Sequence, residues 1–171
     1  MPRSQRKHGV AGLTLVEVTI VMVVLVIAAA LVAPSLGSTA PSQLRSAAAM
    51  LAADLDLARV ASITQGHDPC VLIIDVDQGR YHLARASDPD TPIAHATDGT
   101  DHVVTFGHGR ARTLAGVTFA GVDHAPDNHV AFGPFGQLAG DDDIVITLAC
   151  ADRAITITVD AETGDATISG L

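Results

Sequence analysis

The feature that most constrains this chain is a run of apolar residues near its beginning, interrupted by one acidic side chain. Residues 13–33 read LTLVEVTIVMVVLVIAAALVA, and Glu17 is the only charged residue among them. At about 1.5 Å per residue, a helix of this length would extend roughly 30 Å, the thickness of a bilayer core. Arg3, Arg6 and Lys7 precede the run and predict a cytoplasmic N-terminus. The sequence therefore predicts a single membrane-spanning helix with the rest of the chain outside the cytoplasm.

Glu17 requires an explanation, because a carboxylate at the centre of a spanning helix costs on the order of 2.5–3.5 kcal/mol and usually has a function. One alternative is that Glu17 only complements the positive end of a helix dipole. A second alternative is a cleaved secretory signal, which the small residues at 28–30 leave open, although such signals have shorter apolar regions.

The segment GLTLVE at residues 12–17 resembles the processing site of type IV prepilins and of type II secretion pseudopilins. In that family a prepilin peptidase cuts after the glycine, and the new N-terminal residue is methylated. The resemblance implies a cut between Gly12 and Leu13, methylation of Leu13, and Glu17 as the fifth residue of the mature chain. Leu13 replaces the more usual phenylalanine. Pro34 lies where the family commonly has a helix bend.

This cleavage would give Glu17 a physical role. The cut creates a positively charged amine at Leu13, at the head of an apolar helix. When such helices pack side by side, the Glu17 carboxylate of one subunit can neutralise the amine of its neighbour in a medium of low dielectric constant. A slip of one residue would leave both charges unpaired, so the pair would fix the register of filament assembly.

The remainder of the chain is acidic. Glu17 is the only one of the 19 acidic residues before Gly37, whereas three of the 10 basic residues precede it. From Gly37 onward, 18 acidic residues face seven arginines, a formal charge of −11. Such a surface repels phosphate backbones, so the composition disfavours nucleic acid as a partner.

Residues 42–65 show the three- and four-residue spacing of an amphipathic helix. Ser42 is the expected N-cap and Gly66 the expected end. Two prolines and a glycine between residues 34 and 41 predict a bend or break before this helix. The expected buried stripe consists of Leu44, Ala48, Leu51, Leu55, Ala58 and Ile63.

From residue 69 the pattern changes to short β segments. Asp77-Gln78-Gly79 predicts a hairpin between 69–76 and 80–86, and further strands are expected at 102–106, 116–121, 129–134, 143–150, 153–160 and 165–169. Alternation places Ile144, Ile146, Leu148 and Cys150 on one face of their strand, and Ile155, Ile157 and Val159 on one face of the next. The predicted fold class is α+β, with an antiparallel sheet in a two-layer domain.

These observations divide the chain into four parts. We expect a leader peptide at 1–12, a transmembrane and filament-core helix at 13–36, an amphipathic helix that packs on the sheet at 37–68, and a periplasmic β domain at 69–171.

The second half of the chain resembles the GspH/FimT group of minor pseudopilins and minor pilins. Three features carry this resemblance: L-x-x-A-R with Leu55, Ala58 and Arg59, the FGPFGQ turn at 132–137, and a final strand pair that ends in a T-G turn. Residues 86–128 align with nothing in the group and contain His95, His102, His108 and His124.

Other residues that suggest chemistry form no complete motif. Cys70 and Cys150 both lie on the apolar parity of their strands, which suits a buried disulfide, the pairing we favour in an oxidising compartment, and equally two core thiols. The histidines lack zinc-ligand spacing and are expected in polar loops. Asp141-Asp142-Asp143 supplies too few oxygens for calcium by itself and is expected to form a solvated turn. We expect no metal, no cofactor and no small-molecule substrate, and the absence of a catalytic motif predicts that the chain is not an enzyme.

The resemblance implies a minor pseudopilin of a type II secretion system, in the bacterial inner membrane, with its C-terminal domain in the periplasm. The implied partners are other pilin-type subunits, the prepilin peptidase and inner-membrane lipid. Two alternatives stay open: a FimT-like minor pilin of a type IV pilus, serving assembly or DNA uptake, and a single-pass anchored periplasmic adaptor.

Overall fold

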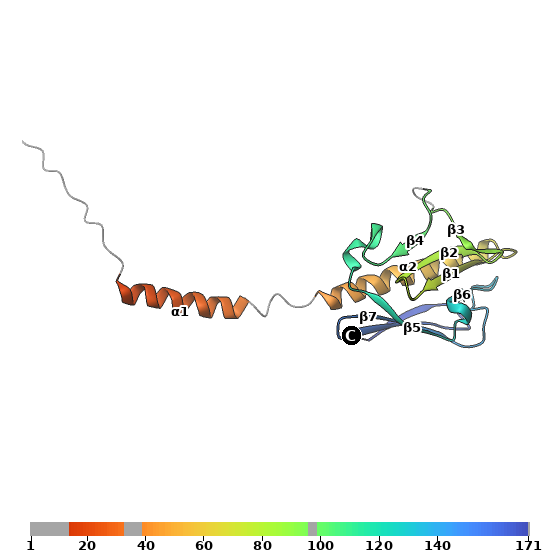
Figure 1. Cartoon of the computed structure of the whole chain (residues 1–171). Coiled ribbons are helices and arrows are strands. Elements are labelled where there is room, and N and C mark those ends of the chain that lie inside the picture. The colour runs from red at the N-terminus through yellow and green to blue at the C-terminus, as the bar shows by residue number, and fades with distance from the viewer. Residues whose placement is uncertain (1–13, 33–38, 96–98, 171) are drawn as a thin grey trace, which may run out of the picture. The chain divides into compact units, whose positions relative to one another are not determined.

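The computed structural model describes residues 14–32, 39–95 and 99–170, without the side chains of residues 29–32. The chain divides into two compact units, residues 1–38 and residues 39–171. The first unit contains helix α1 (Leu15–Val32), and the second contains helix α2 and the described strands (Figure 1). No helix in the described ranges is long and apolar enough to cross a membrane.

Helix α2 (Ala40–Thr64) confirms the predicted amphipathic helix, with a different start. Its N-cap is Thr39, and Pro41 lies in the first turn, where the absent N–H of proline breaks no helical hydrogen bond. The predicted cap, Ser42, is wrong: it lies inside the helix, and its hydroxyl donates to the Thr39 carbonyl oxygen at 2.7 Å. The helix ends where the Gln65 N–H donates to the carbonyl oxygen of Ala61 at 3.0 Å.

The buried face of α2 follows the predicted stripe except at its end. Ile63 is 48% exposed, and the neighbouring Ser62 is buried instead. The Ser62 hydroxyl accepts a hydrogen bond from the Cys70 N–H at 3.0 Å and lies 2.9 Å from the Ala58 carbonyl oxygen. Because these bonds satisfy the hydroxyl, a polar residue can take the last buried position of the helix. The buried residues are Ala40, Leu44, Ala47, Ala48, Leu51, Asp54, Leu55, Ala58 and Ser62.

The first sheet is antiparallel and has the strand order β3-β2-β1-β6, with β4 also paired to β2. Its strands are β1 (Cys70–Asp75), β2 (Arg80–Arg85), β3 (Asp88–Pro92), β4 (Val103–Thr105) and β6 (His129–Ala131). The β1–β2 hairpin confirms the predicted turn at 77–79. Strand β3, whose sequence is DPDTP, was not predicted, because proline and aspartate are depleted in strands. It is an edge strand, the position in a sheet that tolerates proline.

The second sheet is also antiparallel, with the order β5-β7-β8-β9. Its strands are β5 (Thr118–Asp123), β7 (Ile144–Cys150), β8 (Arg153–Val159) and β9 (Ala166–Ser169). The alternation predicted for β7 and β8 is confirmed. The residues predicted to face inward are buried, whereas the alternate residues Val145, Thr147, Ala149, Thr156 and Thr158 are less buried. Two short 3-10 helices, η2 (Gly109–Leu114) and η3 (Pro126–Asn128), flank β5.

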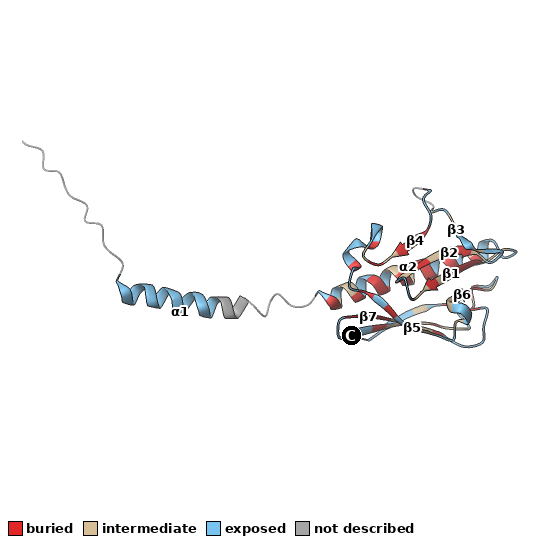
Figure 2. Ribbon diagram, viewed as in Figure 1, coloured by how far each residue is buried: buried red, intermediate tan, exposed pale blue. Residues whose placement is uncertain are grey.

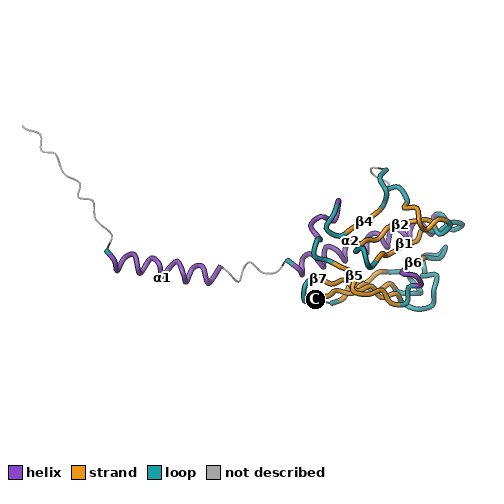
Figure 3. Tube along the Cα trace, viewed as in Figure 1, coloured by secondary structure: helices purple, strands orange, loops and turns teal. Residues whose placement is uncertain are grey.

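The core of the second unit lies where α2 meets both sheets. Figure 3 shows the strands in two groups with α2 alongside them, and the buried residues gather on these facing surfaces (Figure 2). Tyr81 on β2, Phe106 after β4 and Phe119 on β5 form an aromatic cluster, with ring centroids 5.2–6.4 Å apart. The predicted α+β class is confirmed, with two sheets sharing one helix.

The alternation on β8 gives a test of this core. Ile157 is fully buried, so Ile157→Ala should lower the free energy of unfolding by about 2–5 kcal/mol through lost burial and a residual cavity. Thr158→Ala, on the opposite face of the same strand, is the matched control and should cost less than about 1 kcal/mol. Urea denaturation followed by circular dichroism measures both, and equal losses would contradict the register described here.

Candidate functional site

Helix α1 presents an apolar surface with one acidic residue in its first turn. The described large apolar side chains, from Leu15 to Ile27, are 45–84% exposed, and Glu17 is exposed as well. A helix that is apolar on all sides is stable only in apolar surroundings, such as lipid or other helices. The predicted sites Gly12, Leu13 and Pro34 lie outside the described residues.

The start of α1 fixes the position of Glu17. The Thr14 hydroxyl oxygen accepts a hydrogen bond from the Glu17 N–H at 3.2 Å. Thr14 and Glu17 have the spacing of a capping box, in which a glutamate or glutamine three residues after the cap supports the first turn. The sequence TLVE therefore holds the carboxylate at the N-terminal end of the helix, where the positive end of the dipole also favours it.

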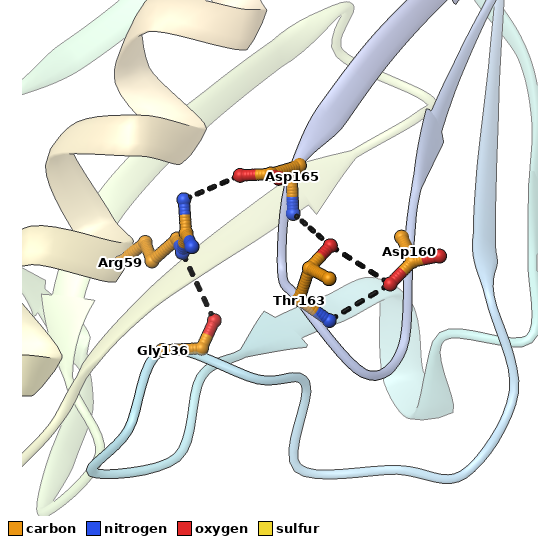
Figure 4. A network of polar contacts seen from close by, with 5 residues as sticks. All are labelled: Arg59, Gly136, Asp160, Thr163 and Asp165. Atoms are coloured by element: carbon orange, nitrogen blue, oxygen red, sulfur yellow. Dashed lines mark hydrogen bonds and ion pairs between the residues drawn. The ribbon is translucent and has the colours of Figure 1, made fainter.

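A second polar network joins the three sequence features that carried the resemblance in the C-terminal half (Figure 4). Arg59 of α2 donates from Nε to the carbonyl oxygen of Gly136 at 3.1 Å and from Nη1 to Asp165 Oδ1 at 2.6 Å. Asp165 follows the T-G turn, whose Thr163 donates its N–H and hydroxyl to Asp160 Oδ1, each at 2.8 Å. These bonds to Thr163 lower the pKa of the Asp160 carboxyl.

Close contact of two turns explains the glycines in this network. Gly164 has φ +68°, and a Cβ there would collide with the carbonyl oxygen of Gly136. Gly136 has φ +88°, and a Cβ there would meet Arg59 Nε at 3.0 Å. Only glycine accepts this conformation and this spacing without strain. Arg59 and the two glycines therefore fasten the last third of α2 to the end of the second sheet.

A third network is buried, and the sequence analysis missed it. Asp54, on the buried face of α2, accepts a hydrogen bond from the Tyr81 hydroxyl at 2.6 Å and from Arg110 Nη2 at 2.8 Å, both at Oδ2. His102 Nε2 lies 3.1 Å from Asp54 Oδ1 and 2.8 Å from Arg110 Nη2. Burial raises the pKa of the Tyr81 hydroxyl, which keeps it a donor, and burial lowers the pKa of the His102 imidazole.

Part of this network could have been found in the sequence. Asp54 lies three residues after Leu51 and four before Ala58, so helical spacing places a carboxylate on the apolar face. A buried carboxylate requires donors, but its donors come from β2, η2 and a residue near β4, which the sequence does not bring together. The expectation of polar loop histidines is wrong for His102, which is 2% exposed.

The favoured disulfide between Cys70 and Cys150 is wrong, because both cysteines are free and buried. The backbone of Cys70 bonds to Ser62, near the end of α2, whereas the Cys150 thiol lies 3.5 Å from Gln43, near its beginning. Ser62 lies 19 residues after Gln43 in the helix, which corresponds to roughly 28 Å. A disulfide requires Cα atoms within about 7 Å, so the alternative of two core thiols is the one observed.

The acidic loop and the histidines form no metal centre in the described part of the chain, where no group of three potential ligands occurs. Asp141 and Asp142 are exposed in the bend that precedes β7. Asp143 Oδ1 accepts the Ala161 N–H at 2.8 Å, which joins the bend to the end of β8.

The fold is shared with solved pilin-type proteins. Two crystal forms of the type IV minor pilin FimU from Pseudomonas aeruginosa PAO1 match 74% and 77% of this chain and 92% and 90% of the FimU chain. The minor pseudopilin EpsH from the Type 2 Secretion System of Vibrio cholerae matches 75% of this chain and 96% of its own. Each match has a TM-score of 0.50 and 15% sequence identity, so the likeness establishes a pilin-like fold. No family model and no curated protein matches the sequence.

The separation of the cysteines predicts their chemistry. In protein purified without reductant and then denatured, two thiols per chain should react with a thiol reagent, because both cysteines are unpaired. Titration with a thiol reagent, with and without prior reduction, measures this. The sequence contains only these two cysteines, so an increase in the number of titrated thiols after reduction would show that they are paired and would contradict the structure.

The Arg59 network gives a prediction of unequal losses. Arg59→Ala should lower the free energy of unfolding by about 2 kcal/mol, because it removes a charged donor from the Gly136 carbonyl. Asp165 is 62% exposed, so Asp165→Asn should cost less than about 1 kcal/mol. Denaturant titrations of the two variants compare these effects. A larger loss of unfolding free energy for Asp165→Asn would show that the ion pair between Arg59 and Asp165 stabilises the domain more than the hydrogen bond to the Gly136 carbonyl does.

Proposed function

We propose that this chain is a minor structural subunit of a pilin-type filament. The observation that carries the proposal is helix α1, whose described exposed side chains are apolar except for Glu17 in the first turn and Thr19. This helix precedes a domain with the fold of FimU and EpsH. The two parts have separate tasks in the proposal: α1 packs with other helices in the filament, and the domain contacts neighbouring subunits. The role requires no catalysis and no cofactor.

Processing by a prepilin peptidase is part of the proposal. The sequence GLTLVE supports a cut between Gly12 and Leu13, followed by methylation of Leu13. Before assembly, the predicted transmembrane segment at 13–36 would hold the subunit in the inner membrane, with the basic residues at 3–7 in the cytoplasm and the domain in the periplasm. Inner-membrane lipid, the peptidase and other pilin-type subunits are the proposed partners. Pro34, outside the described residues, is the proposed position of a helix bend.

Glu17 would then set the height at which neighbouring helices stack. The amine at Leu13 and the carboxylate of a neighbour would pair among apolar side chains, where an unpaired charge is costly. Because Thr14 caps the helix and orients its first turn, the carboxylate has a defined starting position. Correct register would satisfy both charges, and any axial slip would leave both without a partner.

Of the two filament classes, we propose the pseudopilus of a type II secretion system, and a type IV pilus is the alternative. The strongly acidic composition after Gly37 argues against the DNA-binding form of that alternative. Deletion of the gene in its own bacterium separates the two classes: loss of protein secretion supports the pseudopilus, and loss of surface pili with normal secretion supports the type IV pilus.

The charge of Glu17 can be tested without disturbing the helix start. Glu17→Gln retains a residue that supports the capping box, so the variant changes charge alone. We expect normal removal of the leader but at least about tenfold less variant in the isolated filament fraction, because the neighbour's amine loses its partner.

Glu162→Gln is the matched control, since the sequence contains only these two glutamates and Glu162 is exposed in the turn after β8. This control should assemble as the unmodified chain does. Equal incorporation of Glu17→Gln would contradict the proposed pairing. Complete absence of the unmodified chain from filaments would instead support a single-pass periplasmic adaptor.

A further inference from the structure

The buried network around Asp54 has no part in the proposed filament function and contains a conflict of hydrogen bonding. His102 Nε2 lies within hydrogen-bond distance of both Asp54 Oδ1 and Arg110 Nη2. A guanidinium only donates and a carboxylate only accepts. One ring nitrogen cannot accept from Arg110 and donate to Asp54 at the same time. The protonation state of Nε2 therefore decides whether His102 is hydrogen-bonded to Arg110 or to Asp54.

We propose that His102 is a pH-operated switch, which on protonation replaces Arg110 as the partner of Asp54 and releases the 3-10 helix η2. In the neutral form with the ring proton on Nδ1, Nε2 accepts from Arg110, and Arg110 also bonds to Asp54. In the protonated form, Nε2–H donates to Asp54 Oδ1. Arg110 then loses an acceptor and faces a second positive charge at 2.8 Å.

The groups that face His102 favour this exchange. Asp54 on α2 supplies the negative charge, and the Tyr81 hydroxyl on β2 continues to donate to its other oxygen. Arg110 on η2 and His95, whose ring centroid lies 5.0 Å away, supply the positive or protonatable neighbours. With one buried carboxylate and two adjacent cations, the more exposed cation is the one that leaves, because water solvates it at least cost.

Arg110 has a path to solvent. Its side chain is 36% exposed, whereas that of His102 is 2% exposed. Arg110 also lines a cavity of about 420 Å³ together with His95 and Asp101. The displaced guanidinium can therefore move into an open space beside another carboxylate without disturbing the core.

Displacement of Arg110 would loosen η2, because its hydrogen bond to Asp54 is, among the described residues, one of two side-chain hydrogen bonds that join η2 to α2. The other is the hydrogen bond from Gln43 Nε2 to the Thr113 carbonyl oxygen at 2.8 Å. Buried Ala111 and Leu114 also hold η2 in place. Loss of the Arg110 tie should thus open η2 locally without unfolding the domain.

The pH range follows from the surroundings of His102. Burial is the main cause that lowers the pKa of its imidazole below the ordinary value of 6.5. Arg110 and His95 also lower this pKa, whereas Asp54 raises it. The unfolded chain therefore binds this proton at a higher pH than the folded chain does. Stability should fall as the pH drops below 6.5 and level off below the folded-state pKa.

The test measures two sites in the full chain in detergent micelles. Nitrogen-15 NMR of labelled histidines follows His102 Nε2, and hydrogen exchange, corrected for the intrinsic rate, follows the amides of η2. Between about pH 7.5 and about pH 4 we expect Nε2 to gain a proton and η2 protection to fall about tenfold.

Two variants distinguish the switch from general acid loosening. His102→Gln can accept from Arg110 and donate to Asp54 without titrating, so its η2 protection should not depend on pH. His95→Gln removes the neighbouring imidazole and should retain the response. The proposal is overturned if His102→Gln opens equally, or if η2 protection stays constant while His102 titrates. It is also overturned if His102 stays neutral down to about pH 4, a result that the unmodified chain alone can give.

Discussion

The second unit depends on the burial of one face of α2 against two sheets. Small residues such as Ala47, Ala48 and Ala58 on that face leave room for the strands to approach, and Leu44, Leu51 and Leu55 fill the space between them. Sheet residues meet the helix along most of its length, so neither sheet can shift without exposing the core. The pilin-like fold follows from this sharing of one helix between two sheets.

Polar groups on the same face make the packing specific. Asp54 and Ser62 would destabilise the helix face if they were unsatisfied, but Asp54 has donors from β2 and η2, and Ser62 bonds to Cys70 on β1. Arg59, at the border of the buried face, reaches Gly136 and Asp165, 77 and 106 residues further along the chain. A misplaced sheet would therefore lose hydrogen bonds as well as apolar contacts, and this penalty selects one arrangement.

Sequence reasoning succeeded where the signal is local. The alternation in β7 and β8 predicted which residues are buried, because successive side chains of a strand point to opposite faces. Sequence reasoning failed where the outcome depends on which distant segments of the chain lie close together in the fold. Cys70 and Cys150 have the expected parity but lie near opposite ends of α2. The partners of Asp54 lie 27 to 56 residues away, and β3 pairs with β2 despite its two prolines, because the edge position requires no donor from them.

The proposed function depends on the first unit, where the described apolar side chains of α1 are exposed and one carboxylate lies in the first turn. Such a surface is suited to lipid or to other helices, and a freed amine would give Glu17 its partner. Mass spectrometry of the chain isolated from its native membranes tests this central claim most directly. The account predicts an N-terminus at Leu13 carrying one added methyl group. A chain that keeps residues 1–12, or one cut near residues 28–30, would contradict it.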